Sequence, residues 1–288
     1  MNIEVMGHSG CQIDVVPEGE DIYVYKSTKD PKYLNRLALQ AGKQKAASCV
    51  KYQHIRVPEV LEINKEPDKT VVKMQYVYSK NFIEFFEQAG FEQINYLIGA
   101  LKYFLEYEID QCKLECVPAS IFQAKFAEVK RKTESNPYCQ NDEEIREIMT
   151  KAGEWFQSMN CLQIPIGLCH GDLTFSNVLF NGNNYYLIDF LDSFVETPLQ
   201  DIVKIRQDTR YYWSQLMYTK RYDAVRLRIV CDKIDHEIDS YFRGKYQWYA
   251  DNYTSLQLMN ILRILPYSRE AGVVKYLKNI LNELLHEI

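Results

Sequence analysis

The sequence predicts an α+β fold in two lobes: a small β-rich lobe over residues 1–78 and a larger helical lobe over residues 79–288. Two observations support this prediction. Short segments with alternating apolar residues dominate the first lobe, as is typical of strands. From residue 82 onward, apolar residues recur at helical spacing, and this pattern is interrupted only by a β-rich island between residues 167 and 192. We expect a ligand site where the lobes meet, near residues 76–81.

The N-terminal lobe is expected to contain three strands, one helix and two further strands. Pro31 suits the first turn of the helix, and Leu34, Leu37 and Ala41 give that helix an apolar face. The expected strands are 3–7, 11–16, 22–26, 57–63 and 70–77, and the helix is expected over 31–49.

The C-terminal lobe is expected to be helical apart from one hairpin. The tight turn Asn-Gly-Asn-Asn at 181–184 would join a strand at Val178–Phe180 to a strand at Tyr185–Ile188. The expected helices are 82–90, 94–109, 119–132, 142–159, 199–213, 222–243, 251–262 and 269–287.

Composition narrows the class of protein. The net charge is −5 and no long basic run occurs, so we expect no nucleic-acid partner. No long uncharged apolar stretch and no secretory signal are present, which predicts a cytoplasmic protein that does not enter a membrane. The eight cysteines are then expected to be reduced thiols, and the pair Cys112 and Cys116 lacks the neighbours of a metal site.

The segment Cys-His-Gly-Asp-Leu-Thr-Phe-Ser-Asn at 169–177 carries the chemistry. Asp172 lies in a loop after an apolar run, and Asn177 follows five positions later. Asp189 directly follows the second strand of the expected hairpin, and the hairpin would bring it near Asn177. An amide oxygen and a carboxylate are ligands that Mg²⁺ accepts. Asp172 could instead orient an attacking hydroxyl and take its proton.

This pattern resembles the aminoglycoside phosphotransferase and choline kinase family, the small-molecule branch of the protein-kinase-like fold. The motif His-Gly-Asp, the asparagine and the later Leu-Ile-Asp-Phe (187–190) match the catalytic loop and metal-binding aspartate of that fold. The resemblance implies ATP as co-substrate, Mg²⁺ as cofactor, Asp172 as catalytic residue, and Asn177 and Asp189 as metal ligands.

Further residues receive roles from the same resemblance. Lys26 is similar to the lysine that contacts the ATP phosphates, and the turn Gly7, His8, Ser9 and Gly10 resembles the loop that covers them. Gln75, Tyr76 and Val77 fall where the family hinge meets adenine. Asp201 resembles the helix aspartate that braces the catalytic loop, and His170 is expected to hold that loop rather than to carry a proton.

The sequence departs from the family at the N-lobe helix. Family members usually have a glutamate there that pairs with the lysine, but residues 31–49 contain no glutamate. Gln44 is the expected replacement, with Gln40 second, and its amide could still form a hydrogen bond with Lys26.

A small molecule is the expected phosphate acceptor. Gly171 replaces the arginine of the protein-kinase His-Arg-Asp, and only twelve positions separate Asp189 from Asp201, which leaves little room to bind a peptide. Choline kinases line a cationic pocket with a carboxylate and aromatic rings, and Asp208, Tyr212 and Trp213 resemble that set. An aromatic helix face packed in the core, with one exposed aspartate, is an equal alternative for these three. The aromatic and acidic run at 241–253 is a second candidate, and a sugar, amino sugar or aminoglycoside acceptor stays open.

Two other functions also remain open. The missing glutamate would suit a nucleotide-binding module with weak or no catalysis, although Asp172, Asn177 and Asp189 are intact. The same metal groups could also transfer AMP rather than phosphate. The sequence does not predict an oligomeric state.

Overall fold

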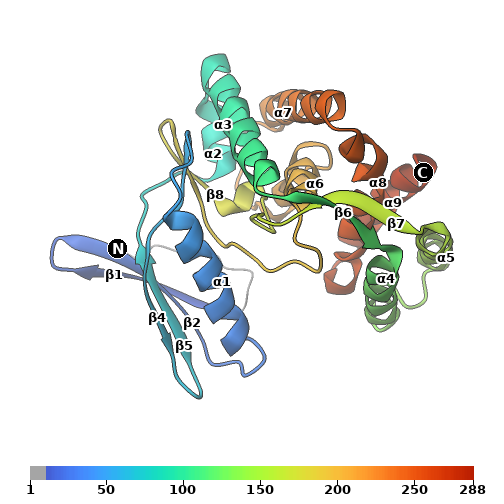
Figure 1. Ribbon diagram of the computed structural model, residues 1–288, viewed down its shortest axis with the longest axis horizontal. Coiled ribbons are helices and arrows are strands. Elements are labelled where there is room, and N and C mark those ends of the chain that lie inside the picture. Colours follow the sequence, from blue (N-terminus) through green and yellow to red (C-terminus); the bar gives the residue numbers. More distant parts are fainter. Residues whose placement is uncertain (1–10) are drawn as a thin grey trace. The chain divides into compact units, whose positions relative to one another are not determined.

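The computed structural model describes residues 11–288 (Figure 1). These residues form two compact units. The first contains residues up to Tyr107, together with His170–Ser193 and Lys220–Val230, and the second contains the remaining segments. The predicted strand at 3–7 and the predicted phosphate loop at 7–10, with Gly7, Ser9 and Gly10, lie outside the described residues.

The first unit is built on a four-stranded antiparallel sheet with the order β1-β2-β5-β4. Because successive side chains of a strand point to opposite faces of the sheet, every second side chain can face the helix α1. This helix covers β4 and β5 (Figure 1). The bounds are β1 Gln12–Glu18, β2 Asp21–Thr28, α1 Leu34–Ser48, β4 Val60–Lys65 and β5 Thr70–Gln75.

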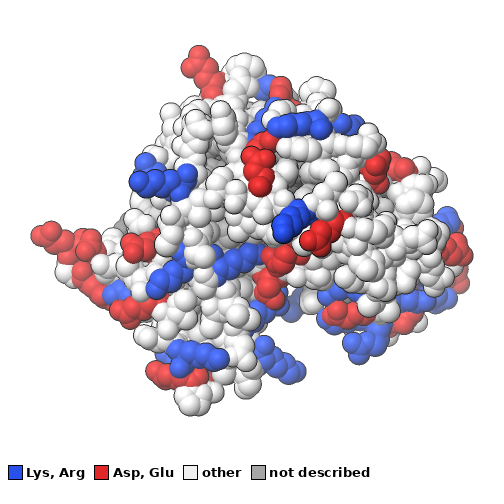
Figure 2. Space-filling model, viewed as in Figure 1, with Lys and Arg blue, Asp and Glu red and all other residues white. Residues whose placement is uncertain are grey.

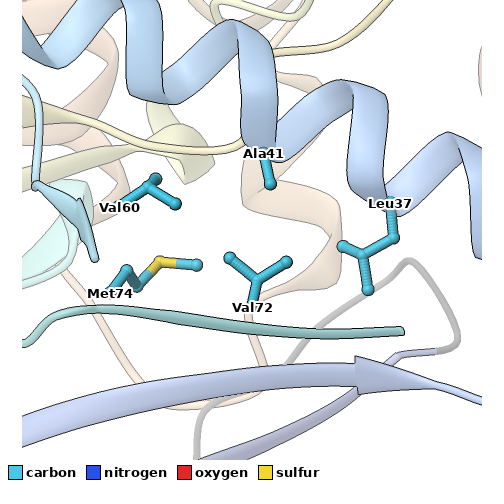
Figure 3. Close-up of a cluster of buried hydrophobic side chains, with 5 residues drawn as sticks. All are labelled: Leu37, Ala41, Val60, Val72 and Met74. Carbon is cyan, nitrogen blue, oxygen red and sulfur yellow. The ribbon is translucent and has the colours of Figure 1, made fainter. Parts of the chain in front are cut away.

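A small apolar cluster fixes α1 on this sheet. Leu37 and Ala41 project from the helix toward Val60, Val72 and Met74 on the strands (Figure 3). All five side chains are at most 9% exposed, and their burial is what positions the other face of the helix.

The predicted hairpin is confirmed and belongs to the same unit. β8 (Val178–Asn181) pairs with β9 (Asn184–Leu187) around Gly182, whose φ of 59° suits a tight turn. The short strand β3 (Ile55–Arg56) adds to β9 in parallel, and the backbone of Lys80 bridges to Phe180. The first unit therefore extends past the predicted lobe boundary at residue 78, because these pairings join the hairpin to the N-terminal segment.

Helices make up most of the second unit. α6 packs on α8, α8 on α9, and α4 and α9 each pack on α5. The bounds are α2 Phe82–Gln88, α3 Phe91–Asp110, α4 Ala119–Glu134, α5 Glu143–Ser158, α6 Pro198–Thr209, α7 Ala224–Lys245, α8 Gln247–Leu262 and α9 Ala271–His286; α2 lies in the first unit, and α3 and α7 run from the first unit into the second.

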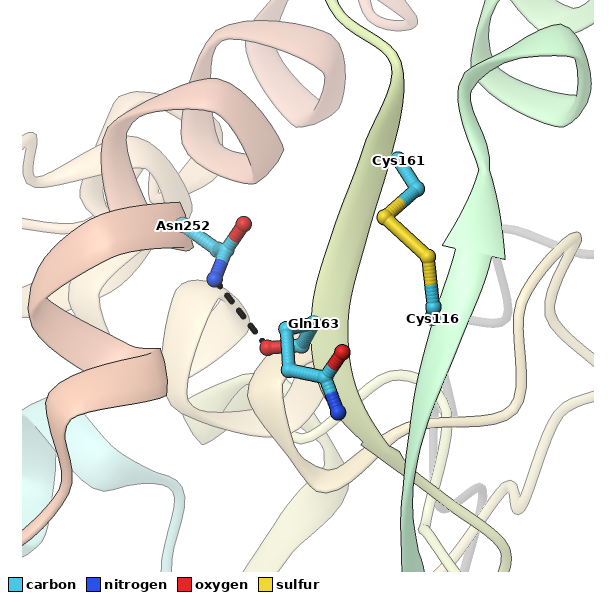
Figure 4. Close-up of a disulfide and its surroundings, with 4 residues drawn as sticks. All are labelled: Cys116, Cys161, Gln163 and Asn252. Carbon is cyan, nitrogen blue, oxygen red and sulfur yellow. Dashed lines mark hydrogen bonds between the residues drawn. A yellow bond between two sulfur atoms is a disulfide. The ribbon is translucent and has the colours of Figure 1, made fainter.

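A two-stranded ribbon in the second unit was not predicted. β6 (Lys113–Pro118) pairs antiparallel with β7 (Cys161–Ile166), and a disulfide joins Cys116 to Cys161 across it (Figure 4). The expectation of reduced thiols is therefore wrong for these two cysteines. Asn252 of α8 donates to the backbone oxygen of Gln163 at 3.2 Å and so attaches the ribbon to the helices.

Two properties concern the whole described chain. No helix within residues 11–288 is long and apolar enough to cross a membrane. On the face drawn in Figure 2, basic and acidic side chains are interspersed, as expected for 34 basic and 39 acidic residues sharing one surface.

Candidate active site

Four of the predicted site residues come together in the first unit. Lys26 Nζ on β2 lies 2.7 Å from Asp189 Oδ1, although the two residues are 163 positions apart. Asn177 Nδ2 donates to Asp172 Oδ2 at 3.0 Å and to the Asp172 carbonyl at 2.8 Å. The two pairs are adjacent because the N–H of Ile188, next to Asp189, donates to the Asn177 carbonyl at 3.0 Å. The sequence-predicted catalytic loop and metal aspartate thus form one cluster with the predicted phosphate lysine.

The predicted catalytic loop is short and closely hydrogen-bonded. Thr174 N donates to the Asp172 carbonyl at 2.7 Å, and the single 3₁₀ turn Phe175–Asn177 then leads directly into β8. This turn places Asn177 back beside Asp172, five positions earlier in the chain. Both bonds of Asn177 to Asp172 are made by its amide nitrogen, so its amide oxygen takes no part in them.

The backbone at Gly171 has no room for the arginine that protein kinases carry at this position. Its φ is +90°, and a Cβ added at this position would lie 2.2 Å from the backbone oxygen of Leu191. Leu191 N in turn donates to the His170 carbonyl at 2.9 Å. The chain near Asp172 and the chain after Asp189 are therefore in direct backbone contact, which only glycine permits.

The side chain of His170 forms hydrogen bonds with both of these segments. It is fully buried, its Nδ1 accepts the N–H of Asp172 at 3.2 Å, and its Nε2 lies 2.9 Å from the carbonyl of Ile188. These partners define a neutral ring with the proton on Nε2. Burial lowers the pKa of His170 to about 4, and the nearby carboxylate of Asp172 opposes this shift only in part.

A pH dependence of stability follows from His170. Its pKa is lower in the folded chain than the ordinary value near 6.5, so protonation favours the unfolded chain as the pH falls from 6.5 toward 4. Between pH 7 and pH 5, the unfolding free energy of the wild type should therefore fall by about 2 kcal/mol more than that of His170→Gln, which has no group to protonate at this position. Urea unfolding of both proteins at both pH values measures this.

The control for that experiment is the exposed His236, replaced in the same way. His236→Gln should follow the wild type at both pH values. If the difference between wild type and His170→Gln were the same at pH 7 and pH 5, the buried neutral ring would not be the cause.

The helix α1 also contacts the segment that carries Asp189. Gln44 Oε1 accepts the Asp189 N–H at 3.2 Å, and Lys43 Nζ donates to the Leu191 carbonyl at 2.7 Å. The expected hydrogen bond from Gln44 to Lys26 is not found among the described residues, because the amide of Gln44 is directed at the backbone. Sequence reasoning missed Lys43; its place beside Gln44 on the same helix was the available signal.

The donor set fits a hard divalent cation. Asp189 offers a carboxylate whose side chain is 35% exposed, and the Asn177 oxygen has no donor among residues 11–288. No cluster of three or more acidic, histidine or cysteine side chains suited to a metal occurs in that range. Mg²⁺ commonly uses one or two protein oxygens together with substrate phosphates, and this set matches that habit.

The remaining predicted residues are placed as follows. Gln75 ends β5, and Tyr76 and Val77 follow it as half-buried residues without regular structure. Asp201 lies in the second unit on α6 and is completely buried. The structure gives no direct test of the hinge role or of the bracing role, so both remain predictions.

The predicted substrate residues also lie in the second unit. Asp208 is 1% exposed, and its Oδ1 accepts the N–H of Ser214 at 3.1 Å and the Ser214 hydroxyl at 2.7 Å. Tyr212 has a left-handed backbone and a hydroxyl bonded to Asp232, and Trp213 is half-buried. Asp208 therefore stabilises the turn at 213–217, whereas the packing alternative expected this carboxylate to be exposed. The substrate role of the three residues remains a prediction.

Comparison with known proteins agrees with this geometry. Residues 95–227, which include the whole stretch from His170 to Asp189, match the model of the phosphotransferase enzyme family. Lys26 and α1 precede that match. A comparison with curated proteins finds no matching sequence.

Solved structures resemble the chain over almost its whole length. Aminoglycoside phosphotransferase APH(4)-Ia, in a ternary complex with AMP-PNP and hygromycin B, aligns with a TM-score of 0.61 at 10% identity, covering 99% of this chain and 92% of that one. The GDP and kanamycin complex of APH(2")-IIIa gives 0.60 at 16% identity, covering 96% and 92%. Spectinomycin phosphotransferase APH(9)-Ia with ADP and spectinomycin gives 0.53 at 14% identity, covering 99% and 91%.

The fold is therefore the predicted α+β, kinase-like fold with a small antiparallel sheet and a large helical part. The predicted resemblance to the aminoglycoside phosphotransferase and choline kinase family is confirmed over residues 95–227 by the family model, and the solved structures agree with it in fold.

Proposed function

We propose that this chain is an ATP- and Mg²⁺-dependent phosphotransferase that moves the γ-phosphate to a hydroxyl of a small molecule. One observation supports this most directly: the ion pair of Lys26 with Asp189 stands beside the hydrogen bond of Asn177 with Asp172. These four side chains are those that phosphate positioning, metal binding and hydroxyl activation require.

In this proposal Asp172 is the general base. Its carboxylate is oriented by Asn177, and it would accept the proton of the substrate hydroxyl as the oxygen bonds to the γ-phosphorus. The bond from that phosphorus to the bridging oxygen breaks, and ADP leaves. Most of the acceleration would come from placing the two reactants in line.

Asn177 and Asp189 would hold the metal, and Lys26 would contact the phosphates. When bound, Mg²⁺ supplies charge neutralisation at the phosphate oxygens. Lys26 is 7% exposed, so its charge is directed into the cluster rather than into solvent. Gln75, Tyr76 and Val77 would contact adenine, and residues 7–10, which lie outside the described residues, would cover the phosphates.

The acceptor is proposed to be a polyhydroxylated or amino-substituted small molecule rather than choline. The neighbouring structures carry hygromycin B, kanamycin and spectinomycin with their nucleotides, which supports this class. The buried, hydrogen-bonded Asp208 weakens the comparison with the cationic pocket of choline kinases. The use of ATP favours a cytoplasmic location, whereas the disulfide between Cys116 and Cys161 is of a kind that is rare there.

The test is nucleotide consumption with Mg²⁺ in the presence of single acceptors. The panel contains aminoglycosides, amino sugars, neutral sugars, nucleosides, choline and ethanolamine, with ATP and GTP run in parallel. We expect one acceptor class to stimulate turnover, and mass analysis should show added phosphate on that acceptor. Added AMP would point to nucleotidyl transfer. Nucleotide binding without stimulation by any acceptor would favour the binding module.

A further inference from the structure

Four polar side chains on one side of α1 contact residues 189–192. In addition to the bonds of Gln44 and Lys43, Gln40 Nε2 lies 3.4 Å from Asp192 Oδ1, and Arg36 Nε lies 3.4 Å from the same oxygen. A neighbouring face of the same helix is buried on the sheet through Leu37 and Ala41. The helix therefore connects the sheet to the segment that carries Asp189, the proposed metal ligand.

Gln44 is the most constrained of the four. It is 3% exposed and uses both ends of its amide: the oxygen accepts the Asp189 N–H, and the nitrogen donates to the Pro58 carbonyl at 3.4 Å. Asp189 has a φ of +60°, a conformation that non-glycine residues adopt rarely and at some cost. The Gln44 oxygen satisfies the N–H at this strained residue, and the Pro58 bond holds the amide in place.

The neutral amide also suits the charges around it. Lys26 pairs directly with Asp189, and no second acidic side chain pairs with it among residues 11–288. A carboxylate at position 44 could still accept the Asp189 N–H, but it could not donate to Pro58. It would also place a second negative charge in a buried position close to Asp189. A glutamine keeps both hydrogen bonds and leaves Lys26 with a single partner.

We propose that Gln44 is a positioning residue for Mg·nucleotide binding: it fixes the backbone of Asp189 rather than the side chain of Lys26. The resemblance predicted a weakened substitute for the family glutamate, whereas the observed bonds give the amide its own task. This inference rests on the proposed function, because it assigns Gln44 a part in the same site.

The experiment measures how binding of a fluorescent, non-hydrolysable ATP analogue depends on Mg²⁺ concentration. Gln44→Met keeps the size of the side chain and removes both bonds. We expect it to raise the Mg²⁺ concentration at half-maximal binding by about 3- to 10-fold, as for loss of one or two hydrogen bonds. Binding of ADP without Mg²⁺ should stay within about twofold, because the lysine is untouched.

Gln44→Glu is the second variant and separates two explanations. If the glutamine were only a lost glutamate, restoring the carboxylate would raise kcat. Our inference predicts a kcat no higher than that of the wild type. The matched control is Gln123, whose Nε2 donates to the Phe156 carbonyl at 2.9 Å in the second unit. Gln123→Met and Gln123→Glu should leave the Mg²⁺ midpoint unchanged.

The outcomes are distinguishable. A raised midpoint in Gln44→Met with normal control variants supports the inference. Normal Mg²⁺ midpoints in folded Gln44 variants, or a higher kcat in Gln44→Glu, overturn the inference and leave the proposed function intact. Absence of Mg²⁺-dependent nucleotide binding by the wild type overturns both.

Discussion

Replacing Asp172 with Ala should reduce kcat by at least about 100-fold and leave nucleotide affinity within about threefold, because the base acts on the acceptor rather than on the nucleotide. The carboxylate of Asp172 is the group that Asn177 orients at 3.0 Å. Its loss also frees the Asn177 amide, which accounts for the small change allowed in affinity. Steady-state kinetics with the identified acceptor, together with direct nucleotide titration, measure the two effects separately.

The control is Asp68→Ala, which removes an exposed carboxylate from the turn between β4 and β5. It should leave both kcat and affinity unchanged. If Asp172→Ala retained wild-type kcat, another group would have to take the hydroxyl proton. If it lost kcat and nucleotide binding together, Asp172 would support the site as a whole rather than act as the base.

Replacing Asp189 with Asn should lower kcat by at least about 100-fold and greatly weaken Mg²⁺-dependent nucleotide binding, because a metal ligand loses its charge. A second effect concerns the protein without nucleotide. Lys26 is 7% exposed and would lose the carboxylate that pairs with it, which leaves a buried charge without compensation. The melting temperature without ligand should therefore fall as well.

A double variant separates the two effects of Asp189→Asn. Lys26→Met removes the uncompensated charge, so the pair Lys26→Met and Asp189→Asn should regain most of the lost thermal stability. It should not regain turnover. Recovery of turnover in the double variant would contradict the metal role, and Asp68→Asn serves as the control that changes a carboxylate elsewhere.

The parts of the fold that the sequence predicted well are those with strong periodicity or a turn signal. The hairpin at 178–187 was predicted because Asn-Gly-Asn-Asn separates two apolar runs, and α5 because an acidic first turn precedes a regular apolar face. The ribbon β6–β7 gave neither signal: β6 is exposed at five of its six residues, and Pro165 lies within β7. Proline argues against a strand except at an edge, and this two-stranded ribbon consists only of edges.

The candidate site divides in a similar way. Spacing was enough to predict that Asp172, Asn177 and Asp189 lie close together in space. Asn177 follows Asp172 by only five positions, and the hairpin brings the chain back so that Asp189 lies beside Asn177. The partner of Gln44 could not be predicted from spacing, since it depends on which backbone group α1 meets in three dimensions. The requirement for Gly171 had the same origin, since it depends on the approach of Leu191 from twenty positions later.

The disulfide between Cys116 and Cys161 affects the protein chiefly when it unfolds. Its two cysteines are 45 positions apart, so the bond closes a loop that contains both α4 and α5. A crosslink of this span restricts the denatured ensemble by an amount worth about 4 kcal/mol in the chain-entropy description. The same polypeptide would then resist denaturation to a different degree in oxidising and in reducing surroundings, with its native hydrogen bonds unchanged.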